Sequence, residues 1–282
     1  MHRIHFKLSA FFTLIVGLLA GFSAMAMSQT TSTASQGQLY LVSVGSGDPD
    51  NMTLKAQKTL QKADLVLIMG GKPGPLENEL QGKVIMDAGH LLFREVQPKN
   101  LPPKMRKSPE ALASQRKKVR QAVRNAIEEG QNVAVIEHGD PTIFGPHIAY
   151  MTEFADLDPI IIPGMSSFNA ANAALGQSMM SGANQTVSLT AAFQLHSDAG
   201  LKQAVNSIKR GTTLVLFMNR NLSDTIQRLS FELPETTPVA IVALAGYETK
   251  QRVWRGTIGN IVERTGGEKL PAHLLYIGTS VQ

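Results

Sequence analysis

The sequence predicts an α/β fold in which most strands are parallel. Short apolar runs alternate along the chain with stretches whose apolar residues recur at helical spacing, and glycine-rich loops follow several of the runs. Repeated strand–helix–strand units of this kind are typical of α/β proteins with mostly parallel sheets. With 282 residues, 43% hydrophobic and 17% charged, the chain has a globular composition and room for one large or two modest domains.

The first 26 residues have the pattern of a secretory signal peptide. A basic start with Arg3 and Lys7 precedes an apolar stretch from Leu8 to Phe22, and Ala24-Met25-Ala26 supplies the small-x-small cleavage pattern. Because the stretch is shorter than the roughly 20 residues of a spanning helix, we favour cleavage over an uncleaved N-terminal membrane tether. Either alternative predicts export, to the periplasm or to a site tethered at the inner membrane. Residues 27–38, rich in Ser, Thr and Gln, are expected to form a flexible tether.

Apolar runs predict strands at 39–45, 63–69, 132–137, 159–164, 212–218, 238–244 and 273–278, and helices are expected at 53–63, 110–129 and 148–155. The clearest helix is 110–129, in which Val119, Val123 and Ile127 belong to an apolar stripe and Gly130 stands at the expected C-cap. The small-residue, Met-rich stretch 176–183 is the expected boundary. It divides an N-terminal α/β domain at 39–180 from a C-terminal α/β domain at 181–282.

The chain has no cysteine, which excludes disulfides, thiolate zinc sites, iron–sulfur clusters and a cysteine nucleophile. We predict no metal site. A lipoprotein is excluded as well, because its lipid is carried by a cysteine.

Three glycine-rich loops follow predicted strands, at 44–49, 138–145 and 163–167. Open α/β sheets bind ligands at the carboxyl ends of their strands, and glycine lets the backbone approach a ligand closely. The first loop has neither the G-x-G-x-x-G pattern of dinucleotide sites nor the Gly-Lys-Ser/Thr of phosphate loops. The pattern therefore predicts a ligand site of another kind.

In this order and spacing, the motifs resemble those of the tetrapyrrole (corrin/porphyrin) methylases, which transfer a methyl group from S-adenosylmethionine (SAM). The resemblance covers residues 39–261. It rests on five segments: LYLVSVGSGDPDNMTLKAQKTLQKADLVL, EHGDPTIFG, IIPGMSSFNAANAALG, TTLVLFM and TPVAIVALAGYETKQRVWRGTIGNI. The last of these is similar to a family segment with a Gln-Arg-Val strand and a Gly-Thr-Leu/Ile turn.

The resemblance implies two α/β domains with SAM in the cleft between them, in a homodimer. The cofactor contacts that it implies are His138, Gly139, Asp140, Ile143, Ser166, Ser167, Met218 and Gly246. Apolar walls, backbone amides and small hydroxyls suit SAM, which carries an adenine, a sulfonium and an amino-acid head. For Met218, plain core packing is the alternative.

The sequence departs from the family pattern in three places. Ser46 replaces the proline of the first glycine loop. Met69 stands where many members carry an acid that assists proton removal from uroporphyrinogen-III, which weakens that substrate for this chain. The third departure is the signal peptide, because known members work in the cytoplasm, where SAM is made.

The catalytic base is not identified by the sequence. Positioning supplies most of the acceleration in methyl transfer, and a base is needed only if the substrate must lose a proton. The candidates are Asp140, His138 and His90. Asp140 is favoured as a residue that shapes its own loop, and the two histidines as structural residues.

Positive charge is concentrated between Lys99 and Arg124, a segment that contains nine lysines and arginines and one acidic residue, Glu110. We favour a solvated helix face, with Arg116, Lys117, Arg120 and Arg124 opposite the apolar stripe. The alternative is steering of an anionic partner, such as a polycarboxylate tetrapyrrole or an acidic lipid surface. Nucleic acid is not expected, because aromatic residues make up 6% and do not interleave with the charge.

Two function classes follow from these observations. The leading hypothesis is an exported SAM-dependent methyltransferase that acts on a tetrapyrrole-like or other small substrate. Relatives that methylate peptide backbone, a diphthamide precursor or ribosomal RNA match the loops less well. The alternative is an exported, non-catalytic protein that uses the same cleft to bind a tetrapyrrole or nucleoside-like ligand.

Overall fold

The computed structural model describes residues 36–97, 101, 103, 106–180, 186–267 and 269–281. The predicted signal peptide and most of the predicted tether lie outside these residues, as do 181–183 of the predicted boundary and part of the basic segment after Lys99. Among the described residues, no helix is both long and apolar enough to cross a membrane.

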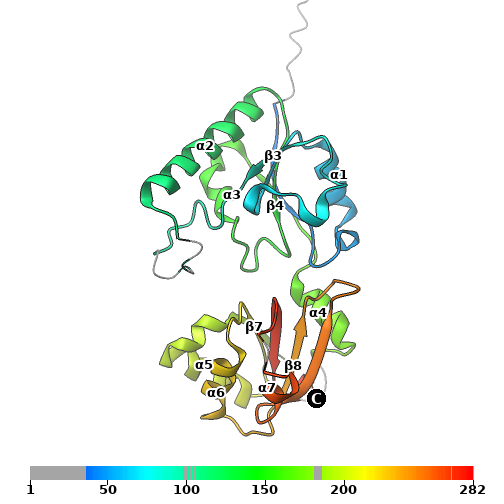
Figure 1. The fold of residues 1–282 in the computed structure, drawn as a ribbon, viewed down its shortest axis with the longest axis vertical. Coiled ribbons are helices and arrows are strands. Elements are labelled where there is room, and N and C mark those ends of the chain that lie inside the picture. The colour runs from blue at the N-terminus through cyan, green and yellow to red at the C-terminus, as the bar shows by residue number, and fades with distance from the viewer. Residues whose placement is uncertain are drawn as a thin grey trace, which may run out of the picture. The chain divides into compact units, whose positions relative to one another are not determined.

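Two five-stranded sheets organise the described chain (Figure 1). The first sheet has the order β3-β2-β4-β1-β5 and the second the order β6-β7-β10-β8-β9. The strands of the first sheet are β1 (Leu39–Ser43), β2 (Leu65–Ile68), β3 (Val84–Asp87), β4 (Val133–Glu137) and β5 (Ile160–Ile162). Those of the second are β6 (Val187–Ala191), β7 (Thr213–Phe217), β8 (Pro238–Ala243), β9 (Arg252–Thr257) and β10 (His273–Ile277). The α-helices are α1 (Leu54–Lys62), α2 (Pro109–Glu128), α3 (Ala149–Glu153), α4 (Ser167–Leu175), α5 (Asp198–Lys209), α6 (Leu222–Ser230) and α7 (Ile261–Arg264).

All seven strands expected from apolar runs are present, and so are the three expected helices. Ser108 caps α2 by accepting a hydrogen bond from the Ala111 amide, and Pro109 occupies its first turn. Gly130 follows the helix with φ of 78°, a conformation that glycine adopts without steric cost. Strands β3 and β6 were missed, because Val84 is exposed and β6 is only partly buried along most of its length.

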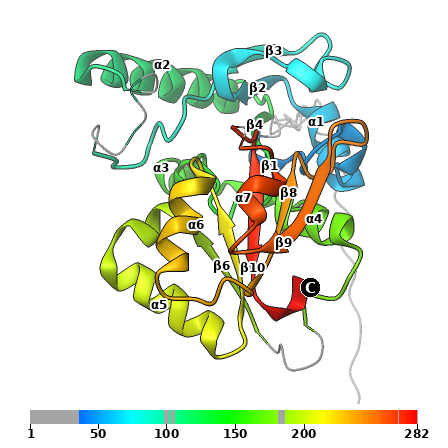
Figure 2. The same cartoon turned by 60° about the horizontal axis from the view of Figure 1, so that its bottom comes forward.

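Both faces of each sheet are covered, which explains the continuous apolar runs. In β7, Leu214 and Leu216 pack with α5 and α6, whereas Val215 and Phe217 pack with α4. Figure 2 shows α5 and α6 together against the second sheet. Helix α4 precedes the boundary predicted at residue 180, yet its Ala171 and Leu175 belong to the core of the second sheet.

The α/β class and the two sheets are confirmed, but the strand directions differ between the sheets. Every pairing in the first sheet is parallel. In the second sheet only β6 and β7 are parallel, while β7–β10, β10–β8 and β8–β9 are antiparallel. An apolar run buried on both faces looks the same in either direction, so the expectation of mostly parallel strands holds for the first sheet alone.

The basic face of α2 is largely engaged with neighbouring segments. Arg120 pairs with Glu153 of α3, and Arg124 pairs with Asp156 at 2.6 Å. Arg116 donates to the Leu92 carbonyl at 2.7 Å. These partners hold the pKa of Arg120 and of Arg124 above the usual range, mainly through the hydrogen bonds to the carboxylates. The arginines therefore hold α2 against α3, against Asp156 just after α3, and against the segment around Leu92 that precedes α2. Arg120 and Arg124 nevertheless remain partly exposed.

Candidate functional site

The first glycine loop is joined to the loop that follows β8. The Asn51 side-chain Nδ2 donates to the Gly246 carbonyl at 2.8 Å, and the Ser46 hydroxyl donates to the Ala245 carbonyl at 3.1 Å. Gly47 lies so close that a Cβ built on it would fall 2.0 Å from the Gly246 carbonyl carbon. Gly47 and Gly246 have φ of 95° and 88°, so the contact depends on two glycines for both space and conformation.

The second motif loop contacts both the first strand and its loop and the start of the third motif helix. The Ser43 hydroxyl donates to the Gly139 carbonyl at 2.6 Å, and the Gly139 amide donates to the Gly45 carbonyl at 2.8 Å. A Cβ on Gly139 would lie 3.8 Å from the Ser167 amide nitrogen. Ser166 caps α4 in a capping box with Asn169, which leaves Ser167 as the first residue of that helix. Three loops that are distant in sequence thus converge around the start of α4.

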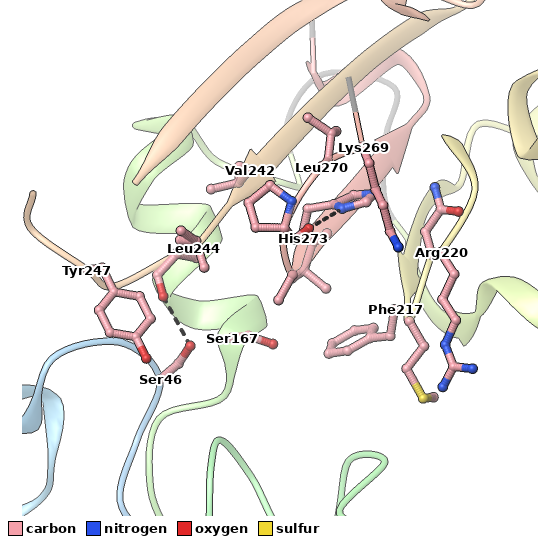
Figure 3. Close-up of a pocket in the computed structure, with 16 residues that line it drawn as sticks. Ser46, Ser167, Phe217, Arg220, Val242, Leu244, Tyr247, Lys269, Leu270 and His273 are labelled. Atoms are coloured by element: carbon pink, nitrogen blue, oxygen red, sulfur yellow. Dashed lines mark hydrogen bonds between the residues drawn. The ribbon is translucent and has the colours of Figure 1, made fainter. Parts of the chain in front are cut away.

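A cavity of about 510 Å³ opens beside this convergence (Figure 3). Phe217, Arg220, Lys269 and His273 lie on one side of it in Figure 3, and Ser46, Leu244 and Tyr247 on the other. Its volume is within the range of small-molecule sites, which are mostly apolar with a few placed polar groups. The lining residues are Ser46, Ser167, Phe217, Met218, Asn219, Arg220, Val242, Leu244, Ala245, Tyr247, Lys269, Leu270, Pro271, Ala272, His273 and Leu274.

The mixed second sheet decides which segments reach the cavity. Strand β10 runs antiparallel to β7 and β8, so that His273 lies opposite Ala243 and Leu275 opposite Leu216. The beginning of β10 and the carboxyl ends of β7 and β8 therefore share one edge. This is why the segment from Lys269 to Leu274, which precedes its strand, lines the same cavity as residues that follow theirs.

Backbone strain accompanies this edge. Met218 and Leu244, the residues at which β7 and β8 give way to loops, have φ of 55° and 49°. Phe144 in the second motif loop has φ of 62°, and its ring lies 5.0 Å from that of Phe217. A non-glycine residue in this region costs on the order of 1–3 kcal/mol, and such residues cluster at ligand sites. Met218 and Leu244 both line the cavity.

The predicted cofactor residues occupy three kinds of position. Ser167 and Met218 line the cavity. Gly139 and Ser166 support the convergence beside it, and Gly246 belongs to the joint with the first loop. His138, Asp140 and Ile143 are not among the lining residues, and Ile143 packs against the core around α4.

The base candidates differ in their surroundings. The Asp140 carboxylate accepts hydrogen bonds from the Thr142 amide at 2.8 Å and the Thr142 hydroxyl at 2.7 Å, so it is occupied in shaping its loop. His138 is exposed at the surface, yet the protein atoms crowded around the ring lower its pKa through desolvation. Burial also lowers the pKa of His90, and the nearby His147 and Arg220 add to the effect. Both rings therefore favour the neutral form at pH 7, as a proton acceptor requires.

A buried contact between Glu137 and His147 joins the two ends of the second motif loop. Glu137, at the end of β4, accepts a hydrogen bond from the His147 amide at 2.9 Å, and its carboxylate lies 3.2 Å from Nδ1 of the His147 ring. Both side chains are almost fully buried. This contact ties the two ends of the loop 138–146 together, and neither residue lines the cavity.

Sequence reasoning missed several cavity residues. Asn219 and Arg220 directly follow Met218, so extending the carboxyl-end rule past β7 would have found them. For His273 no such signal exists, because it begins its strand. Its Nδ1 lies 2.7 Å from the Pro271 carbonyl and must donate to it. Burial lowers the pKa of His273, so the ring is neutral and Nε2 presents an unpartnered lone pair among the described residues.

Within the described residues there is no group of three or more His, Cys, Asp or Glu side chains that could hold a metal ion.

Comparison with known proteins gives consistent matches. The family model described as Tetrapyrrole (Corrin/Porphyrin) Methylases matches residues 38–262. The precorrin-4 C(11)-methyltransferase of Mycobacterium tuberculosis is 28% identical over 82% of this chain and 86% of its own length. The uroporphyrinogen-III C-methyltransferase of Methanocaldococcus jannaschii is 25% identical over 87% of this chain and 97% of its own.

Solved structures show the same fold. A cobalt precorrin-4 methyltransferase, described as a cobalamin biosynthetic enzyme, superposes with a TM-score of 0.66 at 22% identity and covers 88% of this chain and 98% of its own. A uroporphyrin-III C-methyltransferase from Thermus thermophilus, complexed with S-adenosyl homocysteine, gives a TM-score of 0.60 at 21% identity over 87% of this chain and 99% of its own.

Proposed function

Because the chain belongs to the tetrapyrrole methylase family of SAM-dependent methyltransferases, we propose that it transfers a methyl group from SAM to a carboxylate-bearing, tetrapyrrole-like substrate. The observation that carries the proposal is the cavity that both Ser167 and Met218 line. These residues come from the third and fourth motifs, which are separated by about fifty residues of sequence. Their convergence on one cavity of ligand size is what a cofactor site requires.

The residues present fit SAM. Val242, Leu244 and Ala245 offer an apolar wall for an adenine, and the Ser167 hydroxyl makes no hydrogen bond with any described residue. SAM, when bound, supplies a methyl group already activated on a sulfonium, so the protein's own groups need to bind, orient and exclude water.

Within the family, a precorrin-type substrate is favoured over uroporphyrinogen-III. Met69 occupies the position of the acid that the resemblance associates with uroporphyrinogen-III, and its side chain is 41% exposed. Several relatives are named precorrin-4 or cobalt-precorrin-4 C(11)-methyltransferases. A non-catalytic binding role finds no support among the relatives reported above.

The test is calorimetric titration of the purified protein with SAM and S-adenosyl homocysteine, followed by incubation with SAM carrying a labelled methyl group. Precorrin-4 and uroporphyrinogen-III serve as the two acceptors. We expect saturable binding of both cofactor forms and label transfer to precorrin-4 in preference to uroporphyrinogen-III. Absence of binding at millimolar SAM would favour the non-catalytic alternative instead.

Export and dimerisation belong to the proposal as well. The basic start, the short apolar stretch and the Ala-x-Ala pattern support export with cleavage after Ala26, or retention as a membrane tether. A reporter active only outside the cytoplasm, fused after Gln38, should give signal; signal from a reporter active only inside would overturn export. Light scattering on the purified protein would test the homodimer that the family resemblance implies.

A further inference from the structure

A second, smaller cavity adjoins the first at its polar end. It has a volume of about 200 Å³ and shares Arg220, Lys269, Leu270 and His273 with the larger cavity. Its other lining residues include Asn221, Leu222 and Ser223 at the start of α6. Helix α6 is nine residues long and amphipathic, and its first amides carry the partial positive charge of a helix N-terminus.

Positive charge predominates among the described residues that line the two cavities. Arg220 and Lys269 line both, and no aspartate or glutamate is among the described lining residues; Glu268, between Gly267 and Lys269, lies outside the described residues. Neither cation forms an ion pair with another described residue, whereas Arg228 on the same helix pairs with Asp224 at 3.0 Å. Two unpaired cations and a helix start in one place favour an anion.

Asn219 adds an uncharged donor to the same place. Its side chain is buried, with 8% exposed, and lines the larger cavity. The amide oxygen accepts from the Thr225 hydroxyl at 3.0 Å and from the Asn221 amide at 3.3 Å, which fixes the orientation of the group. The amide nitrogen has no partner among the described residues. A buried donor without a partner is costly, so an acceptor that reached this nitrogen, from a ligand or from a water, would stabilise the position.

We propose that Asn219, Arg220 and Lys269 form a subsite for a carboxylate arm of the substrate. The inference rests on the proposed function and specifies how its substrate is recognised. Arginine and amide donors suit a carboxylate, which offers two acceptor oxygens. His273 also faces this junction, but its neutral ring presents a lone pair there and does not contribute a donor.

The cofactor also carries a carboxylate, and charge distinguishes the two sources. SAM has an ammonium and a sulfonium beside its single carboxylate, so its net charge is positive and a cationic lining repels it. A polycarboxylate substrate is attracted by the same lining and offsets the charge of the cofactor. The substrate is therefore the better occupant of the subsite.

The test uses uroporphyrin III as a stable carboxylate-rich probe, measured by fluorescence quenching, and S-adenosyl homocysteine, measured by calorimetry. Asn219→Asp keeps the acceptor for Thr225 and replaces the free donor by a charged oxygen. Arg220→Gln and Lys269→Gln each remove one cation. Arg210→Gln is the matched control, because Arg210 is exposed, ends α5 and lines neither cavity. Thermal unfolding checks that each variant is folded.

We expect Asn219→Asp and Arg220→Gln each to weaken uroporphyrin III binding at least about tenfold, the scale of one lost hydrogen bond to a charged group. Lys269→Gln removes a single ammonium charge and not a two-pronged donor such as the guanidinium, so it should weaken binding by a smaller factor that shrinks further in high salt. Binding of S-adenosyl homocysteine should stay within about twofold in all of them, and Arg210→Gln should match the parent in both measurements.

Other outcomes overturn the subsite. If the variants lose S-adenosyl homocysteine but still bind 5′-methylthioadenosine, which has no carboxylate, the subsite holds the cofactor and the substrate assignment is wrong. If the parent does not bind uroporphyrin III, or Arg220→Gln binds it as the parent does, there is no such subsite. If the parent binds uroporphyrin III through Arg220 but fails to bind SAM, the subsite stands and the proposed methyl transfer fails.

Discussion

The two sheets contribute to the candidate site in different ways. The first sheet supplies backbone: its loops at Gly45–Gly47 and Gly139 are locked by hydrogen bonds to one another and to Gly246. The second sheet supplies side chains: of the described residues that line the larger cavity, only Ser46 and Ser167 come from before residue 186. The glycine motifs therefore hold the strand ends together, while the chemistry of the cavity lies in the second half of the chain.

The largest expected effect comes from breaking the joint between the first loop and the loop after β8. In Gly47→Ala, the new Cβ would fall 2.0 Å from the Gly246 carbonyl carbon at a φ of 95°. We expect a loss of about 3 kcal/mol or more in the free energy of unfolding, because overpacking and positive φ add. Urea unfolding measures it. Gly70→Ala is the control: its φ is also positive, at 78°, but nothing lies within 4 Å of its Cβ, so it should lose only about 1–2 kcal/mol.

Gly139→Val would perturb the convergence of the second and third motifs. A branched side chain at a φ of 78° is strained, although its Cβ would meet only ordinary contacts at 3.8 Å or more. We expect a loss of about 2 kcal/mol of stability together with most of the affinity for S-adenosyl homocysteine. Thermal unfolding and calorimetry separate the two. Should the variant fold and bind as the parent does, the cofactor lies elsewhere.

Two adjacent serines provide a finer comparison. Ser167 lines the cavity with a free hydroxyl, whereas Ser166 caps α4. Ser167→Ala should weaken cofactor binding by about 1 kcal/mol and leave the melting temperature unchanged. Ser166→Ala should cost about 1 kcal/mol of stability and leave intrinsic affinity nearly unchanged. The reverse pattern in calorimetry and melting would show that the cavity residue is misassigned.

The smallest effect on stability and on cofactor affinity is expected from changes on the exposed face of α2. Replacing Lys117 and Arg120 together by glutamine removes two charges of α2, including the partner of Glu153. Exposed ion pairs contribute at most about 1 kcal/mol, so stability should change by no more than that. Affinity for S-adenosyl homocysteine should equal that of the parent, because neither residue lines a cavity. A clear loss of affinity would mean that the basic face of α2 takes part in binding.

The sequence by itself determined the local elements. Apolar runs such as Leu39–Ser43 and Thr213–Phe217 became buried strands, and Gly130 follows the end of the long helix as predicted. It also identified the motif loops, and through them Ser167 and Met218, which line the cavity. These features depend on side-chain periodicity and on backbone conformations that a few residues favour, and both are encoded over short stretches.

Only the tertiary structure decided which segments share the cavity edge. The apolar run at 273–277 is compatible with a parallel or an antiparallel strand. In the fold, Tyr276 lies opposite Val215 of β7 and Ala240 of β8, and β10 runs antiparallel to both strands. That direction brings Lys269 and His273 to the ends of β7 and β8. The tertiary structure also decided that the side-chain nitrogen of Asn219 is unpartnered among the described residues, because Thr225 and Asn221 donate to the side-chain oxygen and so fix the orientation of the group. Strand direction and hydrogen-bond partners follow from contacts between distant residues, which local periodicity does not encode.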